Sequence, residues 1–171
     1  MSKPKTAKES QAISTEIVLP NDTNVLGNLM GGRLLHWMDI VAAIAAHRHS
    51  KRVVVTASVN NVSFNHPIKL GDVVTLQSSI SRAFSTSMEV FVDVLVENHG
   101  TGELVKCNEA IYTFVAVDQL GRPIEVPELI PETDLEKQRH SGALRRRQLS
   151  LILAGKMKPE EATELKALFG K

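Results

Sequence analysis

The chain has 171 residues and a mass of 18.8 kDa, with 43% hydrophobic residues, which suits one globular domain of moderate size and excludes two full ones. Twenty lysines and arginines against nineteen acidic residues leave a formal charge of +1, so no net charge attracts the chain to nucleic acid or to an anionic membrane. Cys107 is the only cysteine, which excludes an internal disulfide and a multi-thiolate zinc site.

Residues 1–13 are largely polar and carry no apolar stretch of the kind found in secretion signals, so we expect a disordered N-terminal segment. No run of about 18 apolar residues follows anywhere in the chain. We therefore expect a cytoplasmic protein with no membrane and no nucleic-acid partner.

The first regular elements predicted are a strand, a loop and a long helix. Ser14–Leu19 is rich in β-branched residues and predicts a strand. Residues 20–32 collect proline, asparagine, aspartate and glycine, a composition typical of an ordered loop, here ending at a helix start. Arg33–His49 predicts a helix of four or more turns that is apolar on nearly all sides, so other structure should wrap it.

Four β-rich segments follow, dense in valine, isoleucine, threonine and phenylalanine: Arg52–Phe64, Asp72–Ser81, Ser87–Glu97 and Glu103–Asp118. The connections are mostly too short for crossover helices, so consecutive strands should pair antiparallel as hairpins. One long helix against one antiparallel sheet is an α+β fold. To cover the helix, the sheet must curl around it or a second copy must pack on it, and both can hold.

Residues 131–171 differ from the rest in their many charges and their helical spacing. Helices are predicted over Leu135–Leu153 and from Pro159, giving a C-terminal helical extension. Arg145, Arg146 and Arg147 are consecutive, so on a helix they point in different directions and indicate a solvated face more than a phosphate site.

Several familiar chemistries lack their motifs. The chain has no G-x-S-x-G, no Walker A loop, no G-x-G-x-x-G after a strand and no C-x-x-C. The histidines His36, His47 and His49 show no H-x-x-x-H pairing, so we expect no metal site and interpret them as surface or packing residues.

Asp39 stands out because it is the only carboxylate in the predicted helix, with apolar residues one turn away on its face. One interpretation is an exposed or ion-paired aspartate at the edge of the apolar surface. The other is a desolvated carboxylate that acts as a base or a nucleophile.

Gly31 and Gly32 stand at the helix start, where the free N–H groups and the positive helix end can stabilise a developing oxyanion. The alternative is a tight turn that needs the backbone freedom of glycine. Asn24, in the same loop, is either a capping or turn residue or a ligand for a carbonyl oxygen or a water molecule.

Five stretches in order resemble the hotdog-fold acyl-CoA thioesterases of the cytosolic acyl-CoA hydrolase group. The stretches are Asn24–Asp39 (NVLGNLMGGRLLHWMD), Val54–Ser58 (VVTAS), Phe64–Asp72 (FNHPIKLGD), Ser87–Glu89 (SME) and Phe114–Pro127 with its FVAVD, Gly121, Pro123 and VP. The resemblance covers residues 14–130 as one hotdog thioesterase domain and leaves the extension 131–171 outside.

This resemblance implies a hotdog fold, a long central helix wrapped by a curved antiparallel sheet. It implies an enzyme that hydrolyses acyl-CoA to free fatty acid and CoA with no cofactor, since CoA is part of the substrate. Asn24 and Asp39 match the family's catalytic pair: Asp39 is the base for water, or else a nucleophile, and Asn24 orients water or carbonyl. The N–H groups of Gly31 and Gly32 would hold the oxyanion. The family also forms dimers joined edge to edge, often assembled into hexamers as trimers of dimers.

Helix geometry adds a constraint on the site. Asp39 lies seven residues beyond Gly32, or roughly 10 Å along a helix at about 1.5 Å per residue, so it hardly reaches its own helix start. If both groups act on one carbonyl, Asp39 of one chain must serve the helix start of its partner. We therefore expect a homodimer with shared active sites.

The CoA contacts are expected along two segments: Thr56, Ala57 and Ser58, and Ser85, Thr86 and Ser87. Many relatives carry Gly-Arg or Gly-Lys shortly before the Ser-Met-Glu motif, where this chain has Phe84 and Ser85. A basic contact to the CoA phosphates is then missing, and Arg82 or the arginines of the extension are candidates to replace it.

Two rival functions share the fold. One is a non-catalytic acyl-CoA-binding regulator, although regulators of that kind carry an added DNA-binding helical module and this extension is short. The other is a dehydratase acting on hydroxyacyl chains, which needs a histidine paired with an acidic residue, and no histidine stands at position 39.

Overall fold

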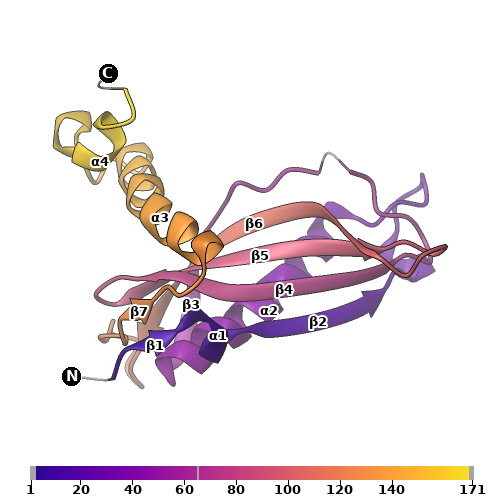
Figure 1. Cartoon of the computed structure of the whole chain (residues 1–171), viewed down its shortest axis with the longest axis horizontal. Helices are drawn as coiled ribbons and strands as arrows, with labels where there is room; N and C mark the ends of the chain where they lie inside the picture. The colour runs from indigo at the N-terminus through magenta and orange to yellow at the C-terminus, as the bar shows by residue number, and fades with distance from the viewer. Residues whose placement is uncertain (1–2, 65, 170–171) are drawn as a thin grey trace. The chain divides into compact units, whose positions relative to one another are not determined.

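The computed structural model describes residues 3–64 and 66–169, which fall into two compact units divided between Ile130 and Pro131. The first unit contains a five-stranded antiparallel sheet in the order β2-β4-β5-β6-β3, with α2 lying along one face of it (Figure 1). Its strands are β2 (Ala12–Ile17), β3 (Val53–Asn60), β4 (Val73–Ala83), β5 (Ser87–Glu97) and β6 (Leu104–Val117). The α+β hotdog fold is confirmed.

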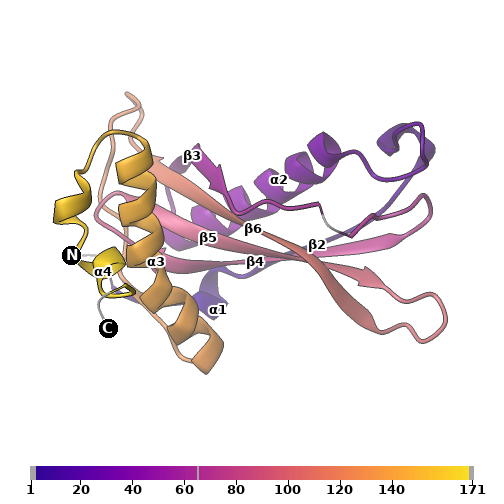
Figure 2. The ribbon, with the colours of Figure 1, turned by 90° about the horizontal axis from the view of Figure 1, so that it is seen from above.

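Helix α2 (Gly31–Ser50) forms the centre of the first unit, and Figure 2 shows it running beside the sheet. Alternate residues of β4, β5 and β6, among them Leu76, Val92 and Tyr112, are buried in one cluster with Met38 and Ala42 of the helix. This alternation follows from the two-residue period of a strand, which places every second side chain on the helix side.

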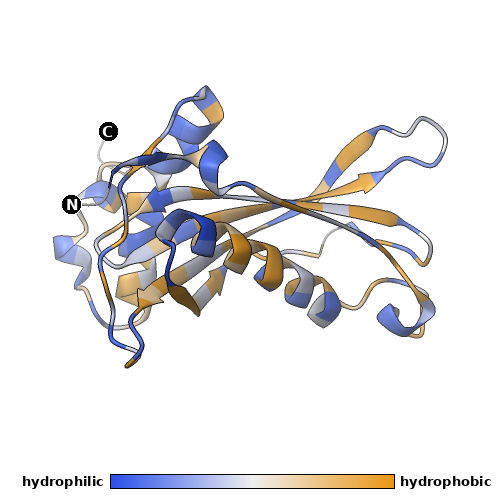
Figure 3. Ribbon diagram, turned by 90° about the horizontal axis from the view of Figure 1, so that it is seen from below, coloured by the Kyte–Doolittle hydropathy of each residue, from blue (hydrophilic) through white to orange (hydrophobic). Residues whose placement is uncertain are grey.

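The sheet covers only one side of α2. Ile40 is 47% exposed and Ile44 41% exposed, although both belong to the helix expected to be wrapped. Seen from the side away from the sheet, α2 carries several hydrophobic bands (Figure 3). The sheet of the single chain therefore curls around α2 only in part, and covering of the rest of the helix by a second copy stays a prediction.

The hairpin prediction is correct for β4, β5 and β6 and wrong for β3. Strand β3 pairs with β6 at one edge of the sheet, and β4 pairs instead with β2 through Ala12–Ile17. Because β2 and β5 occupy both sides of β4, β3 adds to the free side of β6. The other side of β3 pairs with no strand among the described residues and is an open edge.

Residues 1–13 were expected to be disordered, but the structure differs from Lys5 onward. Strand β1 (Lys5–Thr6) pairs in parallel with β7 (Leu129–Ile130), and Lys5 N donates to Glu128 O at 2.9 Å. Helix α1 (Ala7–Ser10) follows, begun by a hydrogen bond from Thr6 N to Glu9 Oε2 and anchored by the buried Ala7. Pairing with residues far along the chain thus orders a segment whose polar composition predicted no regular structure.

The second unit is helical. Helix α3 (Asp134–Leu153) begins with a capping box, in which Thr133 Oγ1 accepts from Glu136 N and Glu136 Oε2 accepts from Thr133 N. A short 3₁₀ turn, η2 (Pro159–Glu161), and helix α4 (Thr163–Lys166) follow. None of the helices described in either unit is long and apolar enough to cross a membrane.

Candidate active site

Asp39 lies on α2 beside the edge strand β3. Thr56 Oγ1 donates a hydrogen bond of 2.8 Å to Asp39 Oδ1, which fixes the carboxylate, and Oδ2 accepts no hydrogen bond from the described residues. Asp39 is partly exposed and forms no ion pair among the residues that the structure describes. The salt-bridged interpretation is therefore not supported.

Tyr112 of β6 is close enough to sense the charge of Asp39. Its hydroxyl donates to Leu35 O at 3.0 Å, and burial, with a smaller contribution from the negative charge of Asp39, raises the pKa of Tyr112 to about 12. Tyr112 thus stays a neutral donor that holds the α2 backbone one turn before Asp39. The sequence indicated Tyr112 only as one of the residues of a strand.

The start of α2 is open. The N-cap residue Met30 makes no side-chain cap, the first turn holds no acidic residue, and the N–H groups of Gly31 and Gly32 have no partner among the described residues. Free donors at the positive end of a twenty-residue helix form a place where a developing negative charge is stabilised.

The turn explanation for the two glycines is wrong, since neither has a positive φ. A Cβ at Gly31 would approach the Phe64 ring to 3.2 Å, so a larger residue there would push against the ring. A Cβ at Gly32 would meet nothing within 4 Å. The space above Gly32 is therefore free for a ligand or a second chain.

Asn24 is held in the loop before the helix. Its Oδ1 accepts from Leu26 N at 2.9 Å and from Asn28 N at 3.2 Å, and Gly27 takes up the left-handed conformation with φ 74° to close the turn. Asn24 is thus a turn residue, and the same turn leaves its Nδ2 free of partners in the described part of the chain, as a donor.

Asn24 and Gly31 line one cavity of about 280 Å³, together with Leu34, Phe64 and the buried Asn108. Asp39 does not line it. It lies eight residues beyond Gly31, about 12 Å along the helix at about 1.5 Å per residue. The structure therefore brings Asn24 and Gly31 together and leaves Asp39 apart from them, beside Thr56.

The two segments expected to contact CoA lie at one level of the sheet. Thr56 and Met88 both pair with Phe114, so Thr56–Ser58 and Ser85–Ser87 are separated only by β6, or about 10 Å for two strand spacings. The register shifts between Thr56 and Ser58, which makes Ala57 a bulge on the open edge.

Fold and site together define a class of protein: a hotdog-fold hydrolase with a positioned carboxylate and an open helix start. Residues 26–103 match the model of the thioesterase superfamily. YkhA of Bacillus subtilis, named as an uncharacterized acyl-CoA thioester hydrolase, is 42% identical over 81% of this chain and 81% of its own. The chain belongs to the thioesterase superfamily, among the acyl-CoA thioester hydrolases.

Two solved structures agree. A hexameric acyl-CoA thioesterase is 37% identical, with a TM-score of 0.85 over 90% of this chain and 98% of that one. An acyl-CoA hydrolase of Staphylococcus aureus, solved with butyryl-CoA and CoA, is 35% identical with a TM-score of 0.83 over 89% and 94% of the two chains. That enzyme was also solved with alanine replacing one asparagine, one aspartate and one threonine, spaced in its sequence as Asn24, Asp39 and Thr56 are here.

Proposed function

We propose that the chain hydrolyses the thioester of an acyl-CoA to a carboxylic acid and CoA, at a site that two copies of the chain build together. The observation that carries this proposal is the separation within one chain of two complementary halves. One half is Asp39 with Thr56, and the other is Asn24 with the open start of α2. Each half lacks what the other supplies.

Asp39 is the general base in this proposal. Its Oδ1 is held by Thr56, so Oδ2 faces the attacking water and takes its proton as the water oxygen bonds to the thioester carbon. The tetrahedral intermediate then breaks its carbon–sulfur bond, and the CoA thiolate takes up the proton from Asp39. Atoms balance with water as the only co-reactant, and no cofactor is required.

The oxyanion formed on the carbonyl oxygen is stabilised by donors of the partner chain. The N–H groups of Gly31 and Gly32 and the Nδ2 of Asn24 are donors without partners among the described residues. They are fixed before the substrate binds, which is the condition under which such donors lower a barrier most. The matching spacing of the three residues replaced in the S. aureus enzyme supports these roles.

The open edge of β3 and the exposed face of α2 support a homodimer. Val53 and Val55 are exposed on β3, as Ile40 and Ile44 are on the helix. An unpaired edge strand flanked by apolar side chains invites pairing with a second copy. The hexameric relative supports a further assembly, which we propose to be a trimer of such dimers.

The thioester hydrolysis is tested by a thiol-detecting assay with acyl-CoAs of short, medium and long chain. We expect CoA release well above the uncatalysed rate for at least one chain length. Binding of acyl-CoA without release at any length would contradict the enzyme and favour the regulatory protein of the same fold.

A further inference from the structure

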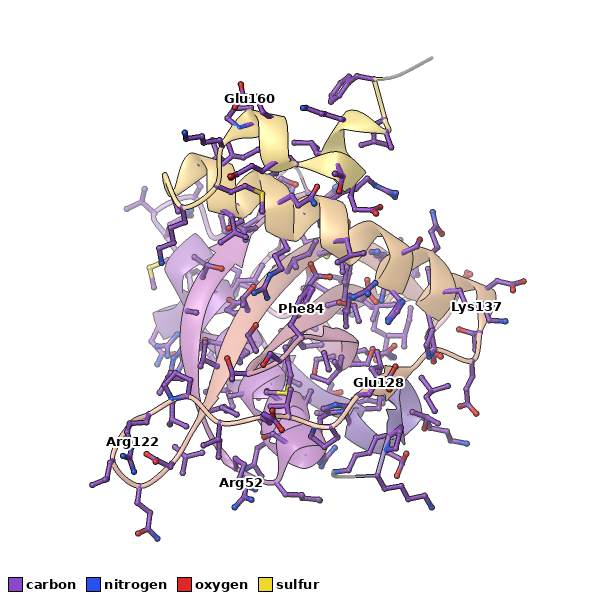
Figure 4. All side chains as sticks on the ribbon, turned by 90° about the vertical axis from the view of Figure 1, so that its left-hand side faces the viewer. Arg52, Phe84, Arg122, Glu128, Lys137 and Glu160 are labelled. Carbon is purple, nitrogen blue, oxygen red and sulfur yellow. The ribbon has the colours of Figure 1, made fainter. Side chains whose placement is uncertain are left out.

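A second cavity, of about 510 Å³, lies where β3 begins and β6 ends. It is lined by Lys51, Arg52 and Val53 on one side and by Val117, Asp118 and Arg122 on the other. Figure 4 shows Arg52 and Arg122 on the same side of the first unit, with Arg122 on the loop that follows β6. No role in the reaction described above uses this cavity.

The cavity is basic. It has three cationic side chains, Lys51, Arg52 and Arg122, and one carboxylate, Asp118. Asp118 is fully engaged: its Oδ1 accepts from the backbone N–H groups of Leu120 and Arg122, and its Oδ2 accepts from Arg122 Nε at 3.0 Å. Lys51 and Arg52 line the cavity and form no ion pair in the described ranges, so no carboxylate there neutralises their charges.

A nearby helix end would ordinarily oppose an anion here, because α2 ends at Ser50 and carries a partial negative charge there. Lys5 removes much of this opposition, since its Nζ donates to Arg48 O at 3.2 Å and to His49 O at 2.6 Å. Burial, and next the positive charge of Lys51, lower the pKa of Lys5. The basic groups at this end are therefore close enough to affect one another.

The cavity continues the proposed path of CoA. Val53 pairs with Val117, and Ala116 N donates to Thr86 O at 3.0 Å, so Thr86 lies next to the cavity wall. Arg52 is four residues before Thr56, about 13 Å along a strand at about 3.3 Å per residue. A chain that leaves the thioester near Asp39 and follows β3 toward its start arrives at these cations.

The segments along that path have no cation of their own. Thr56–Ser58 and Ser85–Ser87 are uncharged, and the nearest basic residue before the second segment, Arg82, places its guanidinium over the Phe84 ring at 5.8 Å from the centroid. The phosphates of a nucleotide bound along these segments therefore need a charge from elsewhere.

We propose that Lys51 and Arg52, with Arg122, bind the phosphates of the 3′-phosphorylated adenosine diphosphate part of the acyl-CoA. The cavity is large enough for a nucleotide, its charge is complementary, and it lies at the end of the path that begins at Asp39. This inference rests on the proposed hydrolysis, because it places the rest of the same substrate.

The test compares two thioesters of the same acyl group, acyl-CoA and acyl-pantetheine, which lacks the nucleotide. In Lys51→Gln with Arg52→Gln we expect kcat/KM for acyl-CoA to fall about 10- to 100-fold through KM, since each lost contact joins two charged groups. We expect kcat/KM for acyl-pantetheine to be unchanged. The control, Lys3→Gln with Lys8→Gln, removes the same charge outside the cavity and should leave kcat/KM for both thioesters unchanged.

An equal loss on both thioesters, or no loss on either, overturns the phosphate site while the hydrolysis stands. Wild-type protein gives a second measurement if the variant does not fold: adenosine 3′,5′-diphosphate should inhibit competitively with acyl-CoA, and more weakly as salt is added. Inhibition that is not competitive assigns the cavity to a separate nucleotide and also overturns the proposal. Hydrolysis of neither thioester by the wild type contradicts the proposed function itself.

Discussion

The two ends of α2 differ in how they are completed. At the C-terminal end, Lys51 adopts a left-handed conformation with φ 56° and donates its N–H to His47 O, while Lys5 Nζ bonds two more carbonyls. At the N-terminal end, Met30 supplies no side-chain cap, and the N–H groups of Gly31 and Gly32 have no partner in the part of the chain that the structure describes. The chain satisfies the C-terminal end of α2 with its own atoms and leaves the N-terminal end open.

The buried His49 belongs to the closed end. Its Nε2 donates to Pro127 O at 2.8 Å, which ties the helix to the segment before β7, and its Nδ1 has no hydrogen-bond partner among the described residues. Through this bond His49 holds the closed end of α2 to the segment before β7. Free backbone groups at the open end cost stability, which is the ordinary condition of a binding site.

The largest effect on activity is expected from Asp39, which lies beside β3 and away from both ends of α2. Asp39→Asn keeps the volume and can still accept from Thr56, but it cannot take a proton from water. We expect kcat to fall by about 10² to 10⁴ with acyl-CoA binding retained. Calorimetric binding and steady-state kinetics on the same sample measure both, with Glu103→Gln as the control. A change in kcat below about twofold would return Asp39 to the status of a surface residue.

Next in size is the recovery of activity by mixing two inactive proteins. Asn24→Ala removes the proposed donor to the oxyanion, and Asp39→Ala removes the proposed base. Each variant alone should be nearly inactive. Unfolded and reassembled together, about half of the dimers are mixed and each has one intact site in two, so roughly a quarter of the wild-type activity should return. If no activity returns while native mass measurement confirms mixed dimers, both residues come from one chain and the shared site is wrong.

A smaller effect separates stability from function at the open end. Gly32→Ala places a Cβ in empty space, so we expect the free energy of unfolding to rise by about 0.5 to 1 kcal/mol through helix propensity. The same Cβ enters the proposed position of the acyl oxygen, and kcat/KM should fall by about tenfold. Denaturant unfolding and kinetics test this pair of outcomes. A variant that is more stable and equally active would show that the open end is not used.

The smallest effect concerns the closed end and pH. Burial is the main cause that lowers the pKa of His49 below its usual 6.5 in the folded protein. Below that usual value the unfolded chain takes up a proton that the folded chain refuses, so stability falls as the pH falls from about 6.5 toward the folded pKa. His49→Gln keeps a donor for Pro127 O without titrating, and it should lose this part of the pH dependence. Denaturant unfolding at several pH values measures this. If the free energy of unfolding changes equally with pH in both proteins between pH 5 and 7, the assignment to His49 is wrong.

Local patterns predicted most elements closely, because period and propensity act over a few residues. The segment Ser87–Glu97 was predicted with the bounds of β5, and the predicted helix Arg33–His49 lies within α2. What the sequence did not reveal depends on contacts between distant residues. The pairing of β3 with β6 and the ordering of Lys5 by Glu128 are such cases.

The same limit applies to the site. Asp39 and the two glycines were recognisable because their types are unusual for their positions. Thr56 was expected to line CoA, and nothing in the sequence indicated its hydrogen bond to Asp39, which joins residues of different elements. The ring of Phe64 against Gly31 was equally hidden, since only the folded chain brings the loop before β4 to the helix start.

The length of α2 between Gly31 and Asp39 has a genetic consequence. In the proposed dimer with shared sites, equal amounts of wild-type and Asp39→Asn chains give mixed dimers that each keep one working site. Total activity should then be about half, as for a simple dose effect. A chain that carries both Asn24→Ala and Asp39→Asn disables both sites of every mixed dimer, so activity should fall to about a quarter. The allele with both substitutions is then dominant-negative, although the Asp39→Asn substitution alone already inactivates a dimer of two mutant chains.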